Sequence, residues 1–134
     1  MRSSMKPAEM ALLAVIVALT LATAYIHYWV GGIILTLNAV GYLTLAVAVV
    51  GSAALFRRAL PLVLLALAAY AAVTIVSWLV MGPYFDVAYL AKGIEIVLIA
   101  AIAFTLRGMA TETRAAITWA MGLPAAVLAM RRSS

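Results

Sequence analysis

Four long apolar runs constrain this 134-residue chain more than any other feature of its sequence. They cover residues 10–30, 33–56, 59–81 and 87–106, and are 21, 24, 23 and 20 residues long. A helix needs about 20 predominantly apolar residues to cross a hydrocarbon core of about 30 Å. The sequence therefore predicts an all-α membrane protein in which four transmembrane helices form an antiparallel bundle.

Composition agrees with a membrane protein and leaves little chain for anything else. Hydrophobic residues make up 69% of the sequence and charged residues 10%, whereas soluble domains average about 45–50% and about 25%. A chain of this length is typical of one domain, so we predict a single membrane domain over residues 1–134. Residues 22–24 also fit a signal-peptide cleavage pattern. The apolar run continues without a break through Trp29, which favours a first span.

A fifth apolar run, residues 115–130, is only 16 residues long and contains Gly122 and Pro124. It is too short and too interrupted to be expected to cross the bilayer. We therefore predict that residues 112–130 form a short C-terminal helix that lies in the membrane interface, with Trp119 at headgroup depth.

The positive residues predict the orientation of the four spans. Short cytoplasmic loops retain lysine and arginine, and six such residues fall on one predicted side of the membrane: Arg2, Lys6, Arg57, Arg58, Arg107 and Arg114. The turns at residues 31–32 and 82–86, on the other side, contain neither type. Both termini are therefore predicted to face the cytoplasm, with the protein in a cytoplasmic-type cell membrane.

The net charge of +5 follows from the same topological residues. The predicted partners are consequently the lipid bilayer and its anionic headgroups, and not nucleic acid. A homo-oligomer or a larger membrane complex is also expected, because alanine and glycine in the spans allow helices to approach closely.

Polar residues of all four spans share one layer of the predicted bundle. Counted at 1.5 Å per residue from the end with the 31–32 turn, Asn38 and Lys92 lie about 8 Å deep, Thr23 and Thr74 about 10 Å, Glu95 about 12 Å, and His27 and Ser77 about 5 to 6 Å. Unpaired polar groups are costly against lipid, so these faces should turn inward. The layer is predicted to bind a ligand or a proton, with Asp86 in the adjacent loop within reach of His27 or Lys92.

Each of these residues also has a purely structural interpretation. Lys92 and Glu95, three positions apart, can neutralise each other while Lys92 extends outward to the headgroups. Alternatively, Glu95 binds and releases a proton, since ionisable residues inside spans are functional candidates. His27 is either an amphipathic anchor at the interface or a proton relay. Asn38 can simply link two helices, and Asp86 can cap a helix.

Aromatic residues gather at the same end of the predicted bundle. We interpret them as an aromatic belt at the membrane surface, with a ligand cage as the alternative. The residues are Tyr25, Tyr28, Trp29, Trp78, Tyr84 and Tyr89.

The sequence offers little chemistry for catalysis, metals or cofactors. It contains no cysteine and a single histidine, so thiolate sites and bis-histidine haem ligation within the chain are excluded; a haem held by His27 and Met81 is sterically conceivable. Glu95 and Asp86 are about 13 Å apart along a helix, too far for a carboxylate pair. We expect no catalytic residues, no metal site and no cofactor, and hence no enzyme.

Three functions remain open. The first is a non-catalytic accessory or structural subunit of a larger membrane complex. The alternative is a proton- or cation-coupled small transporter or channel that acts as a dimer, with Glu95 as the titrating residue. The third is a sensor that binds lipid or another small ligand at the polar layer.

Overall fold

The computed structural model describes residues 5–132, with side chains described for residues 5–122. The chain forms α1 (Pro7–Val30), α2 (Ile33–Leu55), α3 (Leu60–Met81), α4 (Asp86–Gly108) and α5 (Ala110–Arg132). The first four are long and apolar enough to cross a membrane. This confirms the prediction of four such helices, and the largest difference in any bound is at α1, which begins at residue 7 instead of residue 10.

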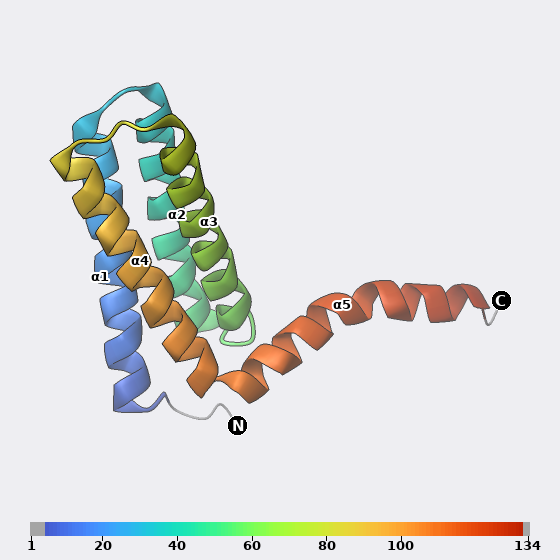
Figure 1. Cartoon of the computed structure of the whole chain (residues 1–134). Helices are drawn as coiled ribbons and strands as arrows, with labels where there is room; N and C mark the ends of the chain where they lie inside the picture. Colours follow the sequence, from blue (N-terminus) through green and yellow to red (C-terminus); the bar gives the residue numbers. More distant parts are fainter. Residues whose placement is uncertain (1–4, 133–134) are drawn as a thin grey trace.

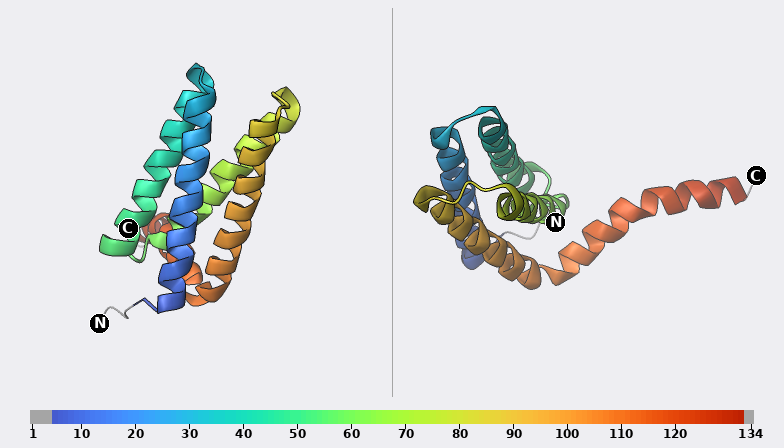
Figure 2. Two further views of the ribbon diagram at one scale, coloured as in Figure 1. Left: turned by 90° about the vertical axis from the view of Figure 1, so that its left-hand side faces the viewer. Right: turned by 45° about the horizontal axis from the view of Figure 1, so that its top comes forward.

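Helices α1 to α4 lie side by side, and the chain reverses direction at each short connection (Figure 1). Each helix contacts the next one along the chain, and α4 returns to contact α1. We call α1 with α2 the first hairpin and α3 with α4 the second hairpin. The outer end of the bundle is the one with the loops at residues 31–32 and 82–85, and the inner end is the one with the loop at residues 56–59. The two hairpins spread apart toward the outer end (Figure 2).

Proline and glycine define where these helices begin and end. Pro7 is the first residue of α1 and Pro61 the second residue of α3, positions at which no amide proton is needed for the helix. The loop between α1 and α2 consists of Gly31 and Gly32, with φ angles of 85° and 88°. Only glycine adopts such angles without a steric cost, so two residues suffice to reverse the chain.

The inner half of the bundle is filled by apolar side chains from all four helices. The fully or almost fully buried ones include Ile16, Val49, Leu60, Leu64, Leu67, Leu98 and Ile102. The outward faces of the same helices are also apolar: Val47, Val80 and Ile96 are at least 59% exposed. A helix that is hydrophobic on every side is typical of a membrane span, so the exposed faces are those expected to contact lipid.

Helix α5 leaves the bundle at the inner end and extends sideways from it (Figure 1). It contacts α3 and α4. Its backbone is helical through Gly122 and Pro124, which agrees with the helix predicted for residues 112–130; a proline can bend a helix without ending it. Its placement in the membrane interface stays a prediction. Arg2 lies outside the described residues.

Candidate functional site

Glu95 lies at the centre of a buried polar cluster in the outer half of the bundle. Its side chain is 0% exposed. The Lys92 ammonium donates to Glu95 Oε2, with Nζ 2.8 Å away. Glu95 Oε1 accepts hydrogen bonds from the hydroxyls of Tyr42, at 3.0 Å, and Thr23, at 3.2 Å. His27 Nε2 lies 3.6 Å from the same oxygen. We call these five residues the Glu95 cluster.

Helical spacing brings the members of the cluster to one place. Lys92 and Glu95 lie three residues apart on one face of α4, and Thr23 and His27 lie four apart on one face of α1. His27 Nδ1 is 2.7 Å from the Thr23 carbonyl oxygen. A carbonyl can only accept, so Nδ1 donates and carries a proton. The other ring nitrogen, Nε2, consequently faces the Glu95 carboxylate.

Helix α3 joins the cluster through hydroxyl groups. Thr74 Oγ1 lies 2.9 Å from the Tyr42 hydroxyl and 2.8 Å from the Ala71 carbonyl oxygen. The Tyr70 hydroxyl donates to the Asn38 carbonyl oxygen at 3.0 Å, and the rings of Tyr70 and Tyr42 meet edge to face at 4.8 Å. All four membrane helices thus contribute a polar group.

Gly41 allows α3 to approach α2 closely at this level. A methyl group at position 41 would overlap the Tyr70 hydroxyl and lie 2.6 Å from Tyr70 Cζ. The absence of a side chain therefore lets the tyrosine ring lie directly against the α2 backbone.

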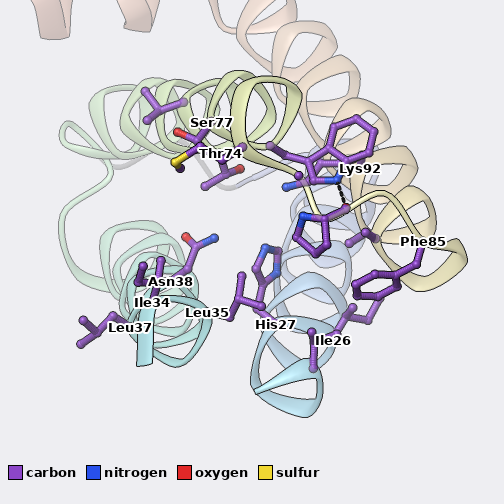
Figure 3. Close-up of a pocket in the computed structure, with 18 of the residues that line it drawn as sticks. Ile26, His27, Ile34, Leu35, Leu37, Asn38, Thr74, Ser77, Phe85 and Lys92 are labelled. Atoms are coloured by element: carbon purple, nitrogen blue, oxygen red, sulfur yellow. Dashed lines mark hydrogen bonds between the residues drawn. The ribbon is translucent and has the colours of Figure 1, made fainter. Parts of the chain in front are cut away.

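A cavity of about 410 Å³ lies between the two hairpins and reaches the outer end. Its walls are mostly apolar, from residues such as Ile34, Val73 and Phe85, and its polar lining residues are His27, Asn38, Tyr70, Thr74, Ser77 and Lys92. His27, Asn38, Thr74 and Lys92 surround one space from four different helices (Figure 3). Glu95 does not line the cavity; His27 and Lys92 lie between the cavity and Glu95.

The structure brings most of the predicted site residues together. Thr23, His27, Lys92 and Glu95 are in direct contact, and Thr74 joins them through Tyr42. Asn38 and Ser77 line the cavity without touching Glu95. Asp86 is instead exposed at the first residue of α4, outside both the cluster and the cavity lining.

Burial bears on the predicted exposure of Lys92 and of His27, and the 2.8 Å ion pair agrees with mutual neutralisation of Lys92 and Glu95. Lys92 is 7% exposed and His27 is 5% exposed. Lys92 therefore does not extend outward to the membrane surface, and its amine points to Glu95. His27 likewise is not an exposed interfacial anchor, because its ring lies inside the bundle against Tyr42, with centroids 5.6 Å apart.

Tyr42 is the member of the cluster that the sequence analysis did not include. It is 0% exposed and contacts Glu95, Thr74, Tyr70 and His27. Two signals were present: a tyrosine in the middle of a span is unusual for a residue that prefers membrane interfaces, and Tyr42 lies four residues after Asn38, on the same helix face.

The aromatic residues at the outer end are mostly on the surface. Tyr25, Tyr28, Trp29, Tyr84 and Tyr89 are 55% to 67% exposed. Trp78 is half-buried, lines the cavity, and donates from Nε1 to the Pro83 carbonyl oxygen at 2.6 Å. It also meets the rings of Tyr84 and Tyr89 edge to face. An aromatic belt remains the prediction for this group.

No protein-family model matches the chain, and neither a curated protein nor a solved structure matches it. In the described part of the chain, no group of three or more histidine, aspartate or glutamate residues could hold a metal ion. Arguments about function consequently depend on the cavity and on the Glu95 cluster.

Proposed function

We propose that this chain is an integral membrane protein that binds one small, mostly apolar molecule in the outer cavity, with the polar end of that molecule directed at the Glu95 cluster. The observation that supports this is the composition of the cavity lining, in which a few polar groups from four helices converge among apolar walls. A volume of about 410 Å³ lies within the range of about 300–1,000 Å³ that is typical of small-molecule sites.

We further propose that the four membrane helices form an antiparallel bundle with one defined orientation in the membrane. Both termini face the cytoplasm and the cavity opens on the opposite side, as the distribution of lysine and arginine favours. Helix α5 then lies along the cytoplasmic interface. Its Trp119 lines a hollow together with Arg57 and Arg58 of the inner loop, and an arrangement of tryptophan beside arginine suits the headgroup region.

Binding is better supported than transport by this one chain. Below the Glu95 cluster the inner half is closed by buried apolar side chains, including Ile16, Leu64 and Leu98. A proton- or cation-coupled carrier would need a second opening toward the inner end, from a rearrangement of the hairpins or from a second copy of the chain. The site itself is the one that such a carrier would use.

Tryptophan quenching tests the proposed binding. The variant Trp29→Phe/Trp119→Phe keeps Trp78, which lines the cavity, as its one tryptophan. In lipid nanodiscs, 8-bromooctan-1-ol should quench this tryptophan along a saturating curve. The matched control is a protein that keeps only Trp29, which is 66% exposed at the same end; its quenching should rise in proportion to the probe dissolved in the lipid.

A filled cavity provides the second half of this test. Ser77→Phe places a ring in the space that the probe occupies and should remove the saturating component. The control is Val76→Phe at the neighbouring position, which is 59% exposed and faces away from the cavity lining. Identical, non-saturating curves for the Trp78-only and Trp29-only proteins would contradict the proposal.

A second candidate function is that of an accessory subunit in a larger membrane complex. Helix α5 favours it, because this helix extends away from the bundle (Figure 1) and exposes Ile117, Trp119 and Met121. A larger protein that copurifies from native membranes in a fixed ratio with the full chain, but not with a chain that lacks α5, would support this role. Purification of the chain alone after mild cross-linking would oppose it.

A further inference from the structure

Lys92 is the positive charge that a molecule in the cavity would meet. Its side chain lines the cavity, and its amine also contacts Glu95 Oε2 at 2.8 Å. The cavity lining contains no aspartate, glutamate or arginine, so Lys92 is the one lysine or arginine side chain that lines it. Glu95 does not line the cavity. Its carboxylate contacts the Lys92 amine and neutralises the positive charge there.

The hydrogen bonds around Glu95 leave a place for one additional proton. His27 Nδ1 donates to the Thr23 carbonyl oxygen, so a neutral His27 turns the lone pair of Nε2 toward Glu95 Oε1, 3.6 Å away. Two lone pairs that face each other are unfavourable. A proton held between them, on either atom, converts this contact into an attraction.

The hydroxyl groups of α2 and α3 can adjust to both protonation states. With an ionised Glu95, Tyr42 donates to Glu95 Oε1 and Thr74 donates to Tyr42. With a protonated Glu95, the carboxyl group can donate to Tyr42, Tyr42 to Thr74, and Thr74 to the Ala71 carbonyl oxygen, which is 2.8 Å away. Each state therefore has a complete set of donors and acceptors without movement of the helices.

Charge neutrality connects the two observations. As it stands, the site holds one positive charge on Lys92 and one negative charge on Glu95. An anion that entered alone would leave a net negative charge inside the bundle, where unpaired charges are costly. If a proton enters with it, the His27–Glu95 pair loses its net negative charge, Lys92 pairs with the anion, and the total charge stays zero.

We infer that the molecule bound in the cavity carries an anionic group, and that its binding is coupled to the uptake of one proton by the His27–Glu95 pair. The inference rests on the proposed binding function. The groups in contact with this pair are Thr23 of α1, Tyr42 of α2 and Lys92 of α4; on α3, Thr74 and Tyr70 reach the pair through Tyr42. Of these, only Lys92 is charged. The other acidic residue of α4, Asp86, is the first residue of that helix and is exposed.

The test compares two probes of one chain length in nanodiscs of zwitterionic lipid, with the Trp78-only protein. The first probe, 8-bromooctane-1-sulfonate, keeps its negative charge at all pH values used; the second, 8-bromooctan-1-ol, is neutral. Between about pH 5 and 8, where histidine-linked sites titrate, the affinity for the sulfonate should fall by about tenfold per pH unit above the transition. The affinity for the alcohol should not change. In weakly buffered solution, a pH indicator should show one proton taken up for each sulfonate bound.

Two variants test the uptake of the proton and the binding of the anion separately. Glu95→Gln is a mimic of the protonated carboxyl group whose amide oxygen still accepts from Lys92; it should bind the sulfonate with no dependence on pH and no proton uptake. In Lys92→Gln, the ratio of the affinity for the sulfonate to the affinity for the alcohol should fall at least tenfold. The proton-uptake measurement on the protein with native Lys92 and Glu95 stands without either variant.

The failure of this inference differs from the failure of the proposed function. If both probes saturate Trp78 quenching equally at every pH, or if the sulfonate binds without proton uptake, the coupling is overturned while the binding function stands. If neither probe gives saturating quenching of Trp78, the binding function itself is overturned. A sulfonate affinity that falls with rising pH, together with proton uptake, supports the coupling.

Discussion

The inner and outer halves of the membrane bundle are buried to the same degree by different means. In the inner half, side chains such as Leu64, Leu98 and Ile16 are 0% exposed and belong to one cluster of buried apolar residues. In the outer half, Glu95 and Tyr42 are equally buried, and hydrogen bonds satisfy them. No buried side-chain nitrogen or oxygen in the described part of the chain lacks a partner.

This difference indicates that the polar groups of the outer half have a role other than stabilising the bundle. An apolar replacement of a buried ion pair is often neutral or stabilising, and the inner half shows that these four helices pack with no buried charge, since its buried polar residues are hydroxyls such as Thr20, Ser52 and Thr105. A buried ion pair is therefore not needed for these four helices to pack. The position of the cluster next to the outer cavity agrees with a binding role.

The largest expected effect comes from removing the charge at the centre of the outer half. Glu95→Ala leaves the Lys92 ammonium buried without its carboxylate and should lower the free energy of unfolding by about 3 to 5 kcal/mol. Unfolding in bicelles by steric trapping would measure this loss. The double variant Glu95→Leu/Lys92→Leu should recover most of it; a double variant as unstable as Glu95→Ala would show that the unpaired charge is not the cause.

A truncation in the inner half should cost somewhat less and for a different reason. Leu64→Ala removes methyl groups from a fully buried position and should lower the free energy of unfolding by about 2 to 4 kcal/mol. Leu65→Ala, at a neighbouring position that is 38% exposed, is the control and should change it far less. The same unfolding assay checks both, and equal losses would mean that the inner half is not closely packed.

The contact of α2 with α3 can be tested at a single glycine. Gly41→Ala forces Tyr70 away from the α2 backbone, and overpacking of this kind should cost about 1 to 3 kcal/mol. Gly51→Ala is the matched control on the same helix, since a methyl group there meets nothing within 4 Å. It should leave stability unchanged or raise it slightly. A loss at position 51 as large as that at position 41 would contradict the close approach.

The smallest expected effect is the loss of one hydroxyl group from the cluster. Tyr42→Phe removes the hydrogen bond to Glu95 and should lower the free energy of unfolding by about 0.6 to 1.7 kcal/mol, as for other hydrogen bonds between membrane helices. Tyr25→Phe, at a position that is 67% exposed, should have no measurable effect. Unfolding of both variants in one lipid composition provides the measurement.

Local pattern was sufficient to predict the helices and much of the cluster. Span length depends on consecutive apolar residues, so four such helices could be predicted from the sequence alone. Depth along a helix follows from the residue count, which is why Thr23, His27, Lys92 and Glu95 could be assigned to one layer before their contacts were known.

What could not be predicted depends on how helices rotate and tilt against each other. Tyr42 was missed because the direction of its side chain depends on how α2 is rotated against the other helices, which a residue count along one helix does not give. Asp86 was expected near Lys92, but α4 begins at that residue and its side chain is exposed. The cavity arises from the divergence of two hairpins (Figure 2). Such a long-range arrangement cannot be predicted from any single run of residues.

The order of the loops has a consequence for the choice of ligand. The outer loops at residues 31–32 and 82–85 each join helices of the same hairpin, and the chain passes from one hairpin to the other only at the inner end, through residues 56–59. No covalent link therefore fixes the width of the cavity mouth. Under the proposed binding function, the cavity should therefore accept ligands of different width, and discrimination among them should depend on headgroup chemistry far more than on the shape of the tail.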